Sequence, residues 1–90
     1  MVVNIEFDPA KDATNLGKHG LSLAWAAEFD FTSAVVVIDD RFDYGEVRFR
    51  AFAYANGQGR CLVFTAVNST TIRAISYRRA RQKEMQRHGL

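Results

Sequence analysis

The chain has 90 residues, of which 48% are hydrophobic, and a net charge of +2 at pH 7. This length predicts one domain over residues 1–90, and a single Pro with no polar tract argues against disorder. No apolar stretch approaches the ~20 residues that a membrane span needs, and the first residues lack a signal-peptide pattern. Because there is only one cysteine, Cys61, no internal disulfide can form. The composition predicts a small cytoplasmic protein.

The charges are divided between the two halves of the chain. Residues 1–46 carry nine Asp/Glu and three Lys/Arg, whereas residues 47–90 carry nine Lys/Arg and one Glu. Two explanations remain open at this point. The acidic half neutralises the basic half in the folded protein, or the basic half forms a face for an anionic partner such as a phosphate-rich molecule.

The first third of the chain predicts a strand followed by two helices. Alternation over residues 2–7 predicts the strand, with Val3, Ile5 and Phe7 on one side. A helix over residues 9–18 is expected to begin after a capping Asp8 and to end at Gly20. It is expected to turn an apolar stripe inward, formed by Ala10, Ala13 and Leu16. A second helix is predicted over residues 23–29.

The remaining elements alternate like strands, and a helix follows them. The continuous β-branched run over residues 34–38 predicts a strand covered on both faces. Residues 46–55 and 60–67 predict a hairpin whose turn is Asn56-Gly57-Gln58-Gly59. Residues 71–77 predict the last strand and residues 78–87 the last helix. The predicted fold is an α+β two-layer domain, β-α-α-β-β-β-β-α, with an antiparallel sheet and the first helices on one face.

Candidate functional residues are cations and their neighbours. Lys18 and His19 close the first helix, Arg41 and Arg48 flank the connection before the hairpin, Arg50 shares a strand face with Arg48, and Arg78-Arg79 follow the last strand. Strict alternation in the last strand places Arg73, Ile75 and Tyr77 on one face and Ser76 on the other. For Arg73, phosphate binding and an ion pair with Glu6 or Asp43 are equally favoured.

The two histidines and the last helix each permit a structural and a functional interpretation. His19 could serve as a general acid or base, but from its position a contact with the last helical carbonyls is favoured. His88 is expected to be frayed. The last helix is expected to be solvated and lightly docked, or else to clamp RNA, DNA or an acidic protein segment. One Cys and two His give no metal-ligand spacing, so neither a metal nor a cofactor is predicted.

Three segments resemble blocks of the BrnT-type toxins. Ile5–Lys11 with Asn15–Ser22 is similar to the family's Phe-x-Asp-Pro-x-Lys and Asn-x-x-Lys-His-Gly-Val-Ser-Phe. Asp40–Arg48 is similar to its Asp-x-Arg-x-x-Tyr-Gly-Glu-x-Arg, and Ile72–Ala80 with Glu84 to its Ile-Arg-Ile-Ile-Ser-Ala-Arg-x-Ala-x-x-x-Glu. The three blocks occur in order and cover nearly the whole chain, which makes the resemblance specific.

The resemblance implies a bacterial type II toxin with a RelE-like fold that cleaves RNA without a metal and inhibits translation. It also implies a BrnA-type antitoxin as partner, in a hetero-oligomer with two copies of each chain that binds DNA through the antitoxin and represses its own operon. No membrane partner is implied. Interaction through a basic face without catalysis is the alternative, and direct DNA binding is a weaker third interpretation.

The resemblance also suggests roles for residues of this chain. The expected catalytic set is Lys18, His19, Arg73, Ser76 and Arg78, and the expected RNA-binding set is Arg41, Arg48, Arg50, Tyr77 and Arg79.

Two positions depart from the family pattern Val-Tyr-Thr-x-Arg. Phe64 stands where the family has Tyr, and Val67 where it has Arg, while Tyr77 could restore a hydroxyl nearby. If the missing arginine binds the scissile phosphate, its loss predicts a weakened or inactive copy.

Overall fold

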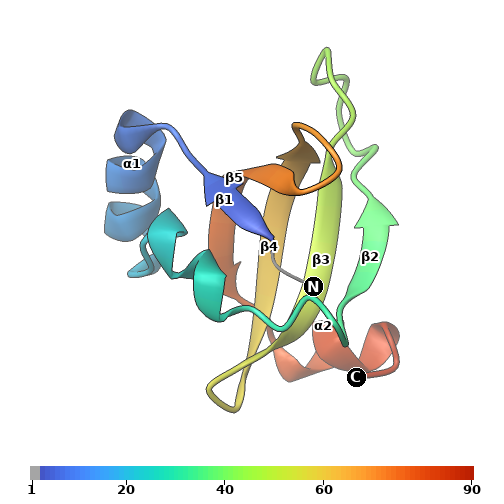
Figure 1. The fold of residues 1–90 in the computed structure, drawn as a ribbon. Coiled ribbons are helices and arrows are strands. Elements are labelled where there is room, and N and C mark those ends of the chain that lie inside the picture. Colours follow the sequence, from blue (N-terminus) through green and yellow to red (C-terminus); the bar gives the residue numbers. More distant parts are fainter. Residues whose placement is uncertain (1–2) are drawn as a thin grey trace.

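A computed structural model describes residues 3–90 of the chain, so Val2 of the predicted first strand lies outside the described residues. Its elements in chain order are β1 (Asn4–Glu6), α1 (Pro9–His19), the 3-10 helix η1 (Leu23–Glu28), β2 (Val35–Ile38), β3 (Phe49–Ala55), β4 (Gln58–Ala66), β5 (Thr71–Arg79) and α2 (Gln82–Arg87). The five strands form one sheet in the order β1-β5-β4-β3-β2 (Figure 1). Within this part of the chain, no helix is long and apolar enough to cross a membrane.

The sheet is mixed, which corrects the prediction of a purely antiparallel one. The strands β2 to β5 form the expected antiparallel meander, but β1 pairs in parallel with β5. Pairing between the first strand and the last cannot be inferred from local patterns, because nothing in either segment specifies a partner at the other end of the chain.

The ends of α1 follow the predicted signals, but its inner face does not. The Asp8 side chain accepts a hydrogen bond from the Ala10 amide, and Gly20 adopts φ 71° at the other end. The expected apolar stripe of Ala10, Ala13 and Leu16 is exposed, and the buried residue of this helix is Asn15. The apolar contribution comes instead from Leu21, Leu23 and the rest of the η1 segment.

Asn15 fastens α1 to the exposed edge of β5. Its Nδ2 donates to the carbonyl oxygens of Leu21 at 2.7 Å and Tyr77 at 2.9 Å, and its Oδ1 accepts from the Tyr77 amide at 3.1 Å. One side-chain amide therefore pairs with both backbone groups of Tyr77, as a neighbouring strand would. This contact satisfies the backbone hydrogen-bonding groups of β5 at Tyr77, beyond the point where the pairing with β1 ends.

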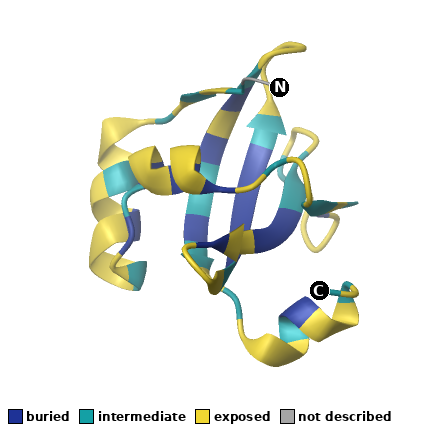
Figure 2. Cartoon of the chain, turned by 60° about the horizontal axis from the view of Figure 1, so that its bottom comes forward, coloured by how far each residue is buried: buried dark blue, intermediate teal, exposed yellow. Residues whose placement is uncertain are grey.

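The main core lies between η1 and one face of the sheet (Figures 1 and 2). It consists of buried residues from η1 and its flanks and from three strands: Leu21, Leu23, Ala26, Phe29, Ala51, Ala53, Leu62, Phe64, Ile72, Ala74 and Tyr77. Val3, Ile5 and Phe7 pack against this cluster from the first strand, as predicted. The predicted position of the first helical segments on one face is correct for η1, whereas α1 lies beside the edge of β5.

A second, smaller core lies beneath α2 on the opposite face. Phe52, Cys61 and Met85 are at most 1% exposed there. The ring of His88 stacks on Phe52 at 4.1 Å, so the prediction of a frayed His88 is wrong. The prediction of a solvated and lightly docked last helix is correct for most of α2, whose residues are largely exposed, while Met85 is the residue of this helix that is buried against the sheet. A Cβ atom on Gly59 would lie 2.8 Å from Met85 Cγ, which shows how closely α2 approaches β4.

The start of the last helix and the exposure of β2 also differ from the predictions. The last helix begins at Gln82 rather than residue 78, because Arg78 and Arg79 continue β5 by pairing with Cys61 and Arg60. The strand β2 lies at the edge of the sheet and is not covered on both faces, since Ile38 is 62% exposed. A β-branched run fits an edge strand as well as a central one, so composition alone did not separate the two.

Candidate functional site

Three expected site residues of β5, Arg73, Ser76 and Arg78, share one face because this strand contains a bulge. Val63 pairs with Ser76, but the next residue of β4 pairs with Ala74, which leaves Ile75 as an extra residue. The bulge reverses the alternation expected from the sequence. Arg73, Ser76 and Arg78 therefore share the face of Thr65, Val63 and Cys61, whereas Tyr77 lies on the core side with Leu62 and Ala74.

A groove separates α1 from the bulged segment of β5. This α1–β5 groove has a volume of about 330 Å³ and is lined by Ala10, Lys11, Thr14, Asn15, Lys18, His19, Ile75 and Ser76. Three of the five residues expected to be catalytic thus line one depression: Lys18 and His19 from the last turn of α1, and Ser76 from β5.

A second hollow of about 570 Å³ adjoins the groove and shares Lys11 and Ile75 with it. The cations Lys11, Arg48 and Arg73 line this Arg73 hollow, together with Glu6, Asp8 and Glu46. The cations come from a helix, the loop before β3 and the last strand, so only the tertiary fold brings them together.

Burial and nearby cations lower the pKa of His19 below its usual value. Partial burial is the larger cause, and the positive charges of Lys18 and Arg78 act in the same direction. A neutral imidazole is therefore favoured at neutral pH, which is the form that can accept a proton.

Arg73 forms the ion pair with Glu6 that the sequence left open as one of two interpretations. Its Nη2 lies 2.8 Å from Glu6 Oε1, and the two side chains are 51% and 46% exposed. Exposed pairs of this kind contribute little to stability. Glu6 is thus a counter-ion that a phosphate group could displace, and the contact leaves both interpretations of Arg73 standing.

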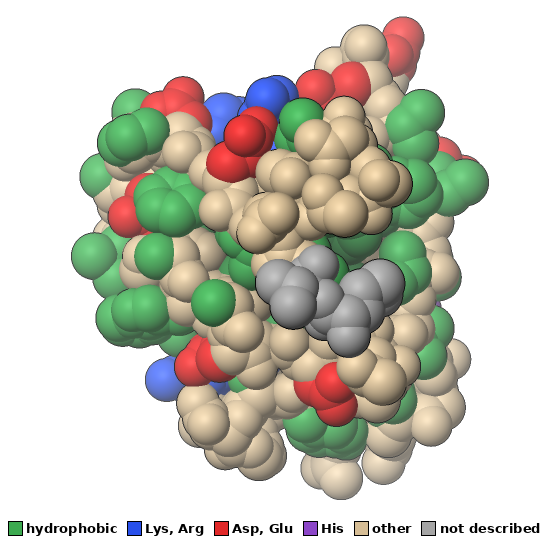
Figure 3. Space-filling model, in the orientation of Figure 1, with side chains coloured by type: hydrophobic (Ala, Val, Ile, Leu, Met, Phe, Trp, Pro, Cys, Tyr) green, Lys and Arg blue, Asp and Glu red, His purple; other side chains and the backbone are tan. Residues whose placement is uncertain are grey.

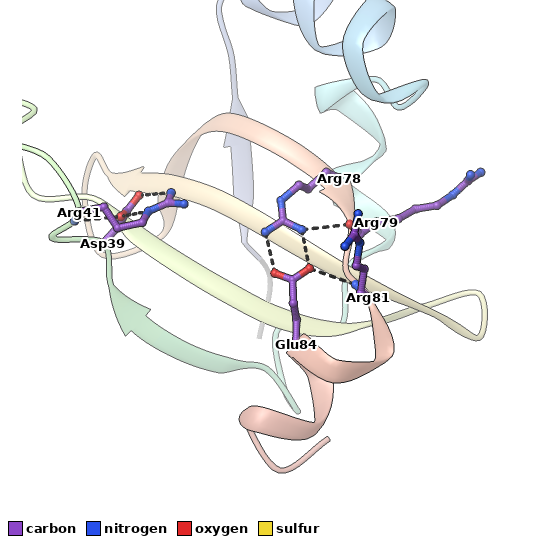
Figure 4. A network of polar contacts seen from close by, with 6 residues as sticks. All are labelled: Asp39, Arg41, Arg78, Arg79, Arg81 and Glu84. Carbon is purple, nitrogen blue, oxygen red and sulfur yellow. Dashed lines mark hydrogen bonds and ion pairs between the residues drawn. The ribbon is translucent and has the colours of Figure 1, made fainter.

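Arg78 holds α2 against the sheet. Its guanidinium group binds both carboxylate oxygens of Glu84 at 2.9 Å, and one nitrogen also donates to the Arg79 carbonyl oxygen (Figure 4). Glu84 also accepts from the Arg81 amide. These contacts, led by the Arg78 hydrogen bonds, lower the pKa of Glu84 to about 2. Most hydrogen-bond donors of Arg78 are therefore occupied. Arg78 affects His19 through the electrostatic effect of its charge and not through a direct contact.

The remaining expected RNA-binding arginines differ in how they are held. Arg41 binds the Asp39 carboxylate with two hydrogen bonds, of 2.7 and 2.8 Å, and these lower the pKa of Asp39 to about 2. Arg48 bonds to Glu46 at 3.1 Å, and its guanidinium carbon lies 4.2 Å from the centre of the Tyr44 ring.

Arg50 is the arginine of this group whose hydrogen-bonding capacity is least satisfied. Within residues 3–90 its buried Nε has no hydrogen-bond partner. It lies on the face of β3 that also carries Phe52, opposite to the main core.

Tyr77 cannot contact RNA in this structure, which corrects its expected role. The residue is fully buried in the main core, and its hydroxyl group bonds to Glu28 Oε1 at 3.1 Å. Burial is the largest cause that raises its pKa to about 12. The hydroxyl that could replace the one missing at position 64 thus lies in the same core cluster as Phe64 and is bonded to Glu28.

The sequence did not single out Asn15 and Lys11 as site residues. Lys11 lines both depressions, and the two hydrogen-bonded contacts of Asn15 with Tyr77 hold α1 at the groove. A signal for Asn15 existed, since a polar residue at the i−4 position relative to His19 lies on the same side of the helix. Within the described residues, no group of three or more His, Cys, Asp or Glu side chains is arranged to hold a metal ion.

Cations are few on the face seen in Figure 1. In that orientation, hydrophobic side chains gather over α1 and η1 and over β2, and Lys and Arg cover only small areas (Figure 3).

Comparisons with known proteins agree with this architecture. The family model of the ribonuclease toxin BrnT of type II toxin–antitoxin systems matches residues 7–84. The crystal structure of the Brucella abortus ribonuclease toxin BrnT superposes with a TM-score of 0.69 at 30% sequence identity, covering 90% of this chain and 100% of that one. No curated protein matches the chain. The protein therefore belongs to the BrnT family of type II toxins.

Proposed function

We propose that this protein is an endoribonuclease toxin that inhibits translation by cleaving RNA in the α1–β5 groove. The observation that carries the proposal is that Lys18, His19 and Ser76 line one groove, next to the hollow that contains Arg73. The reaction is RelE-like and metal-independent: the 2′-oxygen of the RNA attacks the adjacent phosphorus, and the bond to the 5′-oxygen breaks. A cytoplasmic location belongs to the same proposal.

Two proton transfers accompany this reaction. His19 accepts the proton of the attacking 2′-hydroxyl, a role that its lowered pKa supports because the neutral imidazole is the form present. Lys18, the neighbouring cation in the same groove, donates a proton to the departing 5′-oxygen. The assignment of base and acid to these two residues follows from charge: a neutral acceptor and a charged donor.

Arg73 and Ser76 bind the phosphoryl oxygens while negative charge develops on them. Arg73 exchanges Glu6 for the phosphate, and the Ser76 hydroxyl donates a hydrogen bond from the same face of β5. Arg48 positions the strand from the edge of the Arg73 hollow. Arg78 contributes through its charge, because Glu84 occupies its donors.

Cleavage of a labelled RNA by the purified protein tests the reaction. We expect cleavage to persist in EDTA and to disappear when the nucleotide before the scissile bond is 2′-deoxy, because the nucleophile is then missing. Persistent cleavage of the 2′-deoxy substrate, or dependence on an added metal, would contradict the mechanism.

Variants of the groove test the residues. Removal of an electrostatic contact made in the transition state typically costs about 10²–10³-fold in rate, and we expect Arg73→Ala and His19→Ala each to lose activity on this scale. His88→Ala is a matched control, since this histidine stacks on Phe52 outside the groove. If neither the wild type nor the two groove variants cleave RNA, while the variants lose antitoxin binding, the non-catalytic interpretation is correct.

The two departures from the family pattern, Phe64 and Val67, are expected to differ in their effect on activity. Phe64 packs in the main core and stacks on Phe49, on the face opposite to Arg73 and Ser76. Val67 is 43% exposed just beyond β4. We therefore attribute weakened activity to position 67, and Val67→Arg is expected to increase kcat with folding unchanged. A Phe64→Tyr variant that alone increases kcat would contradict this assignment.

We further propose a BrnA-type antitoxin as the partner, in a complex with two copies of each chain that binds operator DNA and represses transcription. Membership of a type II toxin family supports the partner. Co-expression with the neighbouring reading frame followed by native mass spectrometry tests the stoichiometry. An operator gel shift obtained with the toxin alone would contradict the proposal that DNA is bound through the antitoxin.

A further inference from the structure

A cationic cleft lies where β5 passes into α2, outside the α1–β5 groove. This α2 cleft has a volume of about 540 Å³ and is lined by Arg78, Arg79, Arg81, Lys83, Glu84 and Arg87. Figure 4 shows Arg78 and Glu84 facing one another at the strand–helix junction, with Arg81 beside them and the Arg79 side chain extending away from the pair.

The positive charge of the α2 cleft is largely uncompensated. Its carboxylate, Glu84, is held by both nitrogens of Arg78 at 2.9 Å. Within residues 3–90, no carboxylate oxygen lies within 4.0 Å of a side-chain nitrogen of the other four cations, which are Arg79, Arg81, Lys83 and Arg87. Four cations with no counter-ion in one cleft attract an anion.

The backbone that carries these cations is held in place. Met85 is 1% exposed in the second core, and Gly59 permits an approach that a larger residue would block. The ring of His88 and the bidentate Arg78–Glu84 pair hold α2 at two further points. The helix is thus fixed before any ligand arrives, which lowers the ordering cost of binding.

Arg78 connects the α2 cleft with the α1–β5 groove. It lines the cleft, and its charge acts on His19 at the end of the groove. The Arg73 hollow, the groove and the cleft therefore follow one another along β5 from its beginning to its end. Cations line all three depressions, and in the Arg73 hollow they are accompanied by Glu6, Asp8 and Glu46. Cations arranged along one strand in this way suit the backbone of a single-stranded nucleic acid.

The composition of the cleft favours a nucleic-acid backbone over an acidic peptide. The large exposed hydrophobic side chains of residues 3–90 all lie elsewhere, and none of them lines the α2 cleft. Protein interfaces have an apolar centre, whereas binding to a phosphate backbone depends on charge.

We propose that the α2 cleft binds the phosphodiester backbone of the RNA segment that extends beyond the cleavage groove. The proposal rests on the proposed ribonuclease function and adds a second, sequence-independent contact to it. This contact increases the affinity for long RNA and leaves the chemical step unchanged.

Binding of 2′-O-methyl RNA, which cannot be cleaved, tests the cleft. We compare oligomers of about 4 and about 12 nucleotides, which bracket common single-strand site sizes. The variant Arg81→Gln/Lys83→Gln/Arg87→Gln is expected to bind the longer oligomer at least about 10-fold more weakly, with a salt slope lower by about 2, because each single-strand phosphate contact contributes about 0.7. Its affinity for the shorter oligomer is expected to be unchanged.

A charge-retaining control, Arg81→Lys/Arg87→Lys, is expected to bind both oligomers like the wild type. Equal affinity of the neutralised variant and the wild type for the longer oligomer would overturn the proposal. So would an equal loss for both oligomers, or a preference of the wild-type cleft for poly-glutamate over RNA.

Cleavage of a short labelled RNA is measured in parallel. If the wild type does not cleave it, the ribonuclease proposal fails, whatever the length dependence of binding. If the neutralised variant cleaves the short RNA with unchanged kcat but a long RNA with raised KM, both proposals are supported. Thermal melting of the variant shows that folding is retained.

Discussion

At the scale of single residues, environment decides which chemistry each side chain offers. His19 and His88 are the two histidines of the chain. The first lines the groove beside Lys18, and the second stacks on Phe52 in the second core. The two side chains are chemically identical, and only their neighbours make one a candidate base and the other a packing residue.

The lowered pKa of His19 predicts where the rate of RNA cleavage falls off on the acidic side of its pH profile. Because a proton acceptor must be neutral, kcat is expected to fall as pH drops through the His19 pKa, which lies below the usual value of about 6.5. Lys18→Gln removes one of the lowering charges and is expected to raise the His19 pKa, which an NMR titration of the imidazole measures independently of the lost proton donor. An acidic fall-off in rate that is unchanged in His19→Ala would show that another group titrates.

Asn15 is expected to be the most sensitive polar residue of the fold. Asn15→Ala leaves buried backbone groups of Leu21 and Tyr77 without partners. An orphaned group costs about 1–3 kcal/mol, so we expect a loss of about 3 kcal/mol or more. This corresponds to a Tm lower by about 12 °C or more for a domain of this size.

Gly17→Ala is the matched control in the same helix. A Cβ atom at this position meets nothing within 4 Å. The change is expected to stabilise α1 by about 0.5–1 kcal/mol. An Asn15→Ala variant that melts like the wild type would contradict the role of this side chain in holding α1.

At the scale of elements, β5 and α2 determine the site. The bulge at Ile75 turns Ser76 and Arg78 to the face of Arg73 and sends Tyr77 into the core. A strict period of two in a strand assumes that no residue is inserted, and one bulge reverses every assignment beyond it. The helix α2 then covers this face through Met85 and the Arg78–Glu84 pair.

The close approach of α2 to β4 predicts coupling between Gly59 and Met85. Gly59→Ala places a Cβ atom 2.8 Å from Met85 Cγ and 3.1 Å from the Ala80 carbonyl oxygen, so α2 must shift outward. We expect faster hydrogen exchange of the α2 amides in this variant. Residues in contact couple by about 0.5–3 kcal/mol, so Gly59→Ala combined with Met85→Ala should destabilise less than the sum of the single changes. Strict additivity would show that the two residues do not meet.

At the scale of the whole molecule, the charge division of the sequence has two outcomes. Some acids of the first half neutralise arginines of the second, as in Glu6–Arg73 and Glu28–Arg60. In the α2 cleft Arg78 is paired with Glu84, whereas the other four cations keep their charge uncompensated within the described residues. The two explanations left open by the sequence thus apply to different parts of the basic half.

Two ion-paired carboxylates predict how the protein unfolds in acid. Asp39 and Glu84 each have a folded pKa of about 2, below the usual values of 3.8 and 4.5. The unfolded chain therefore binds more protons between about pH 4.5 and pH 2, and stability falls as pH drops through that window. Urea unfolding at several pH values measures this slope.

Glu84→Gln is expected to lower the stability of the folded protein at pH 7 and to make that stability depend less on pH below pH 4.5. Asp40→Asn changes an exposed carboxylate and serves as the control. A slope in Glu84→Gln equal to that of the wild type would show that the Arg78 pair does not contribute.

The sequence by itself determined the local elements and the family. The Asp8 cap, the left-handed Gly20 and the Asn56-Gly57 turn, with φ values of 51° and 76°, follow from the conformations that these residues favour. The motif blocks likewise identified the BrnT family, because they are contiguous in the chain.

Only the tertiary structure decided what depends on distant partners. The parallel pairing of β1 with β5, the polar docking of α1 through Asn15 and the burial of Tyr77 all join segments from opposite ends of the chain. Local sequence specifies backbone preference and amphipathic period, but a bulge, a counter-ion such as Glu6 and a groove exist only where separate elements meet. The site therefore belongs to the packing of α1 and α2 around β5, and not to any one motif.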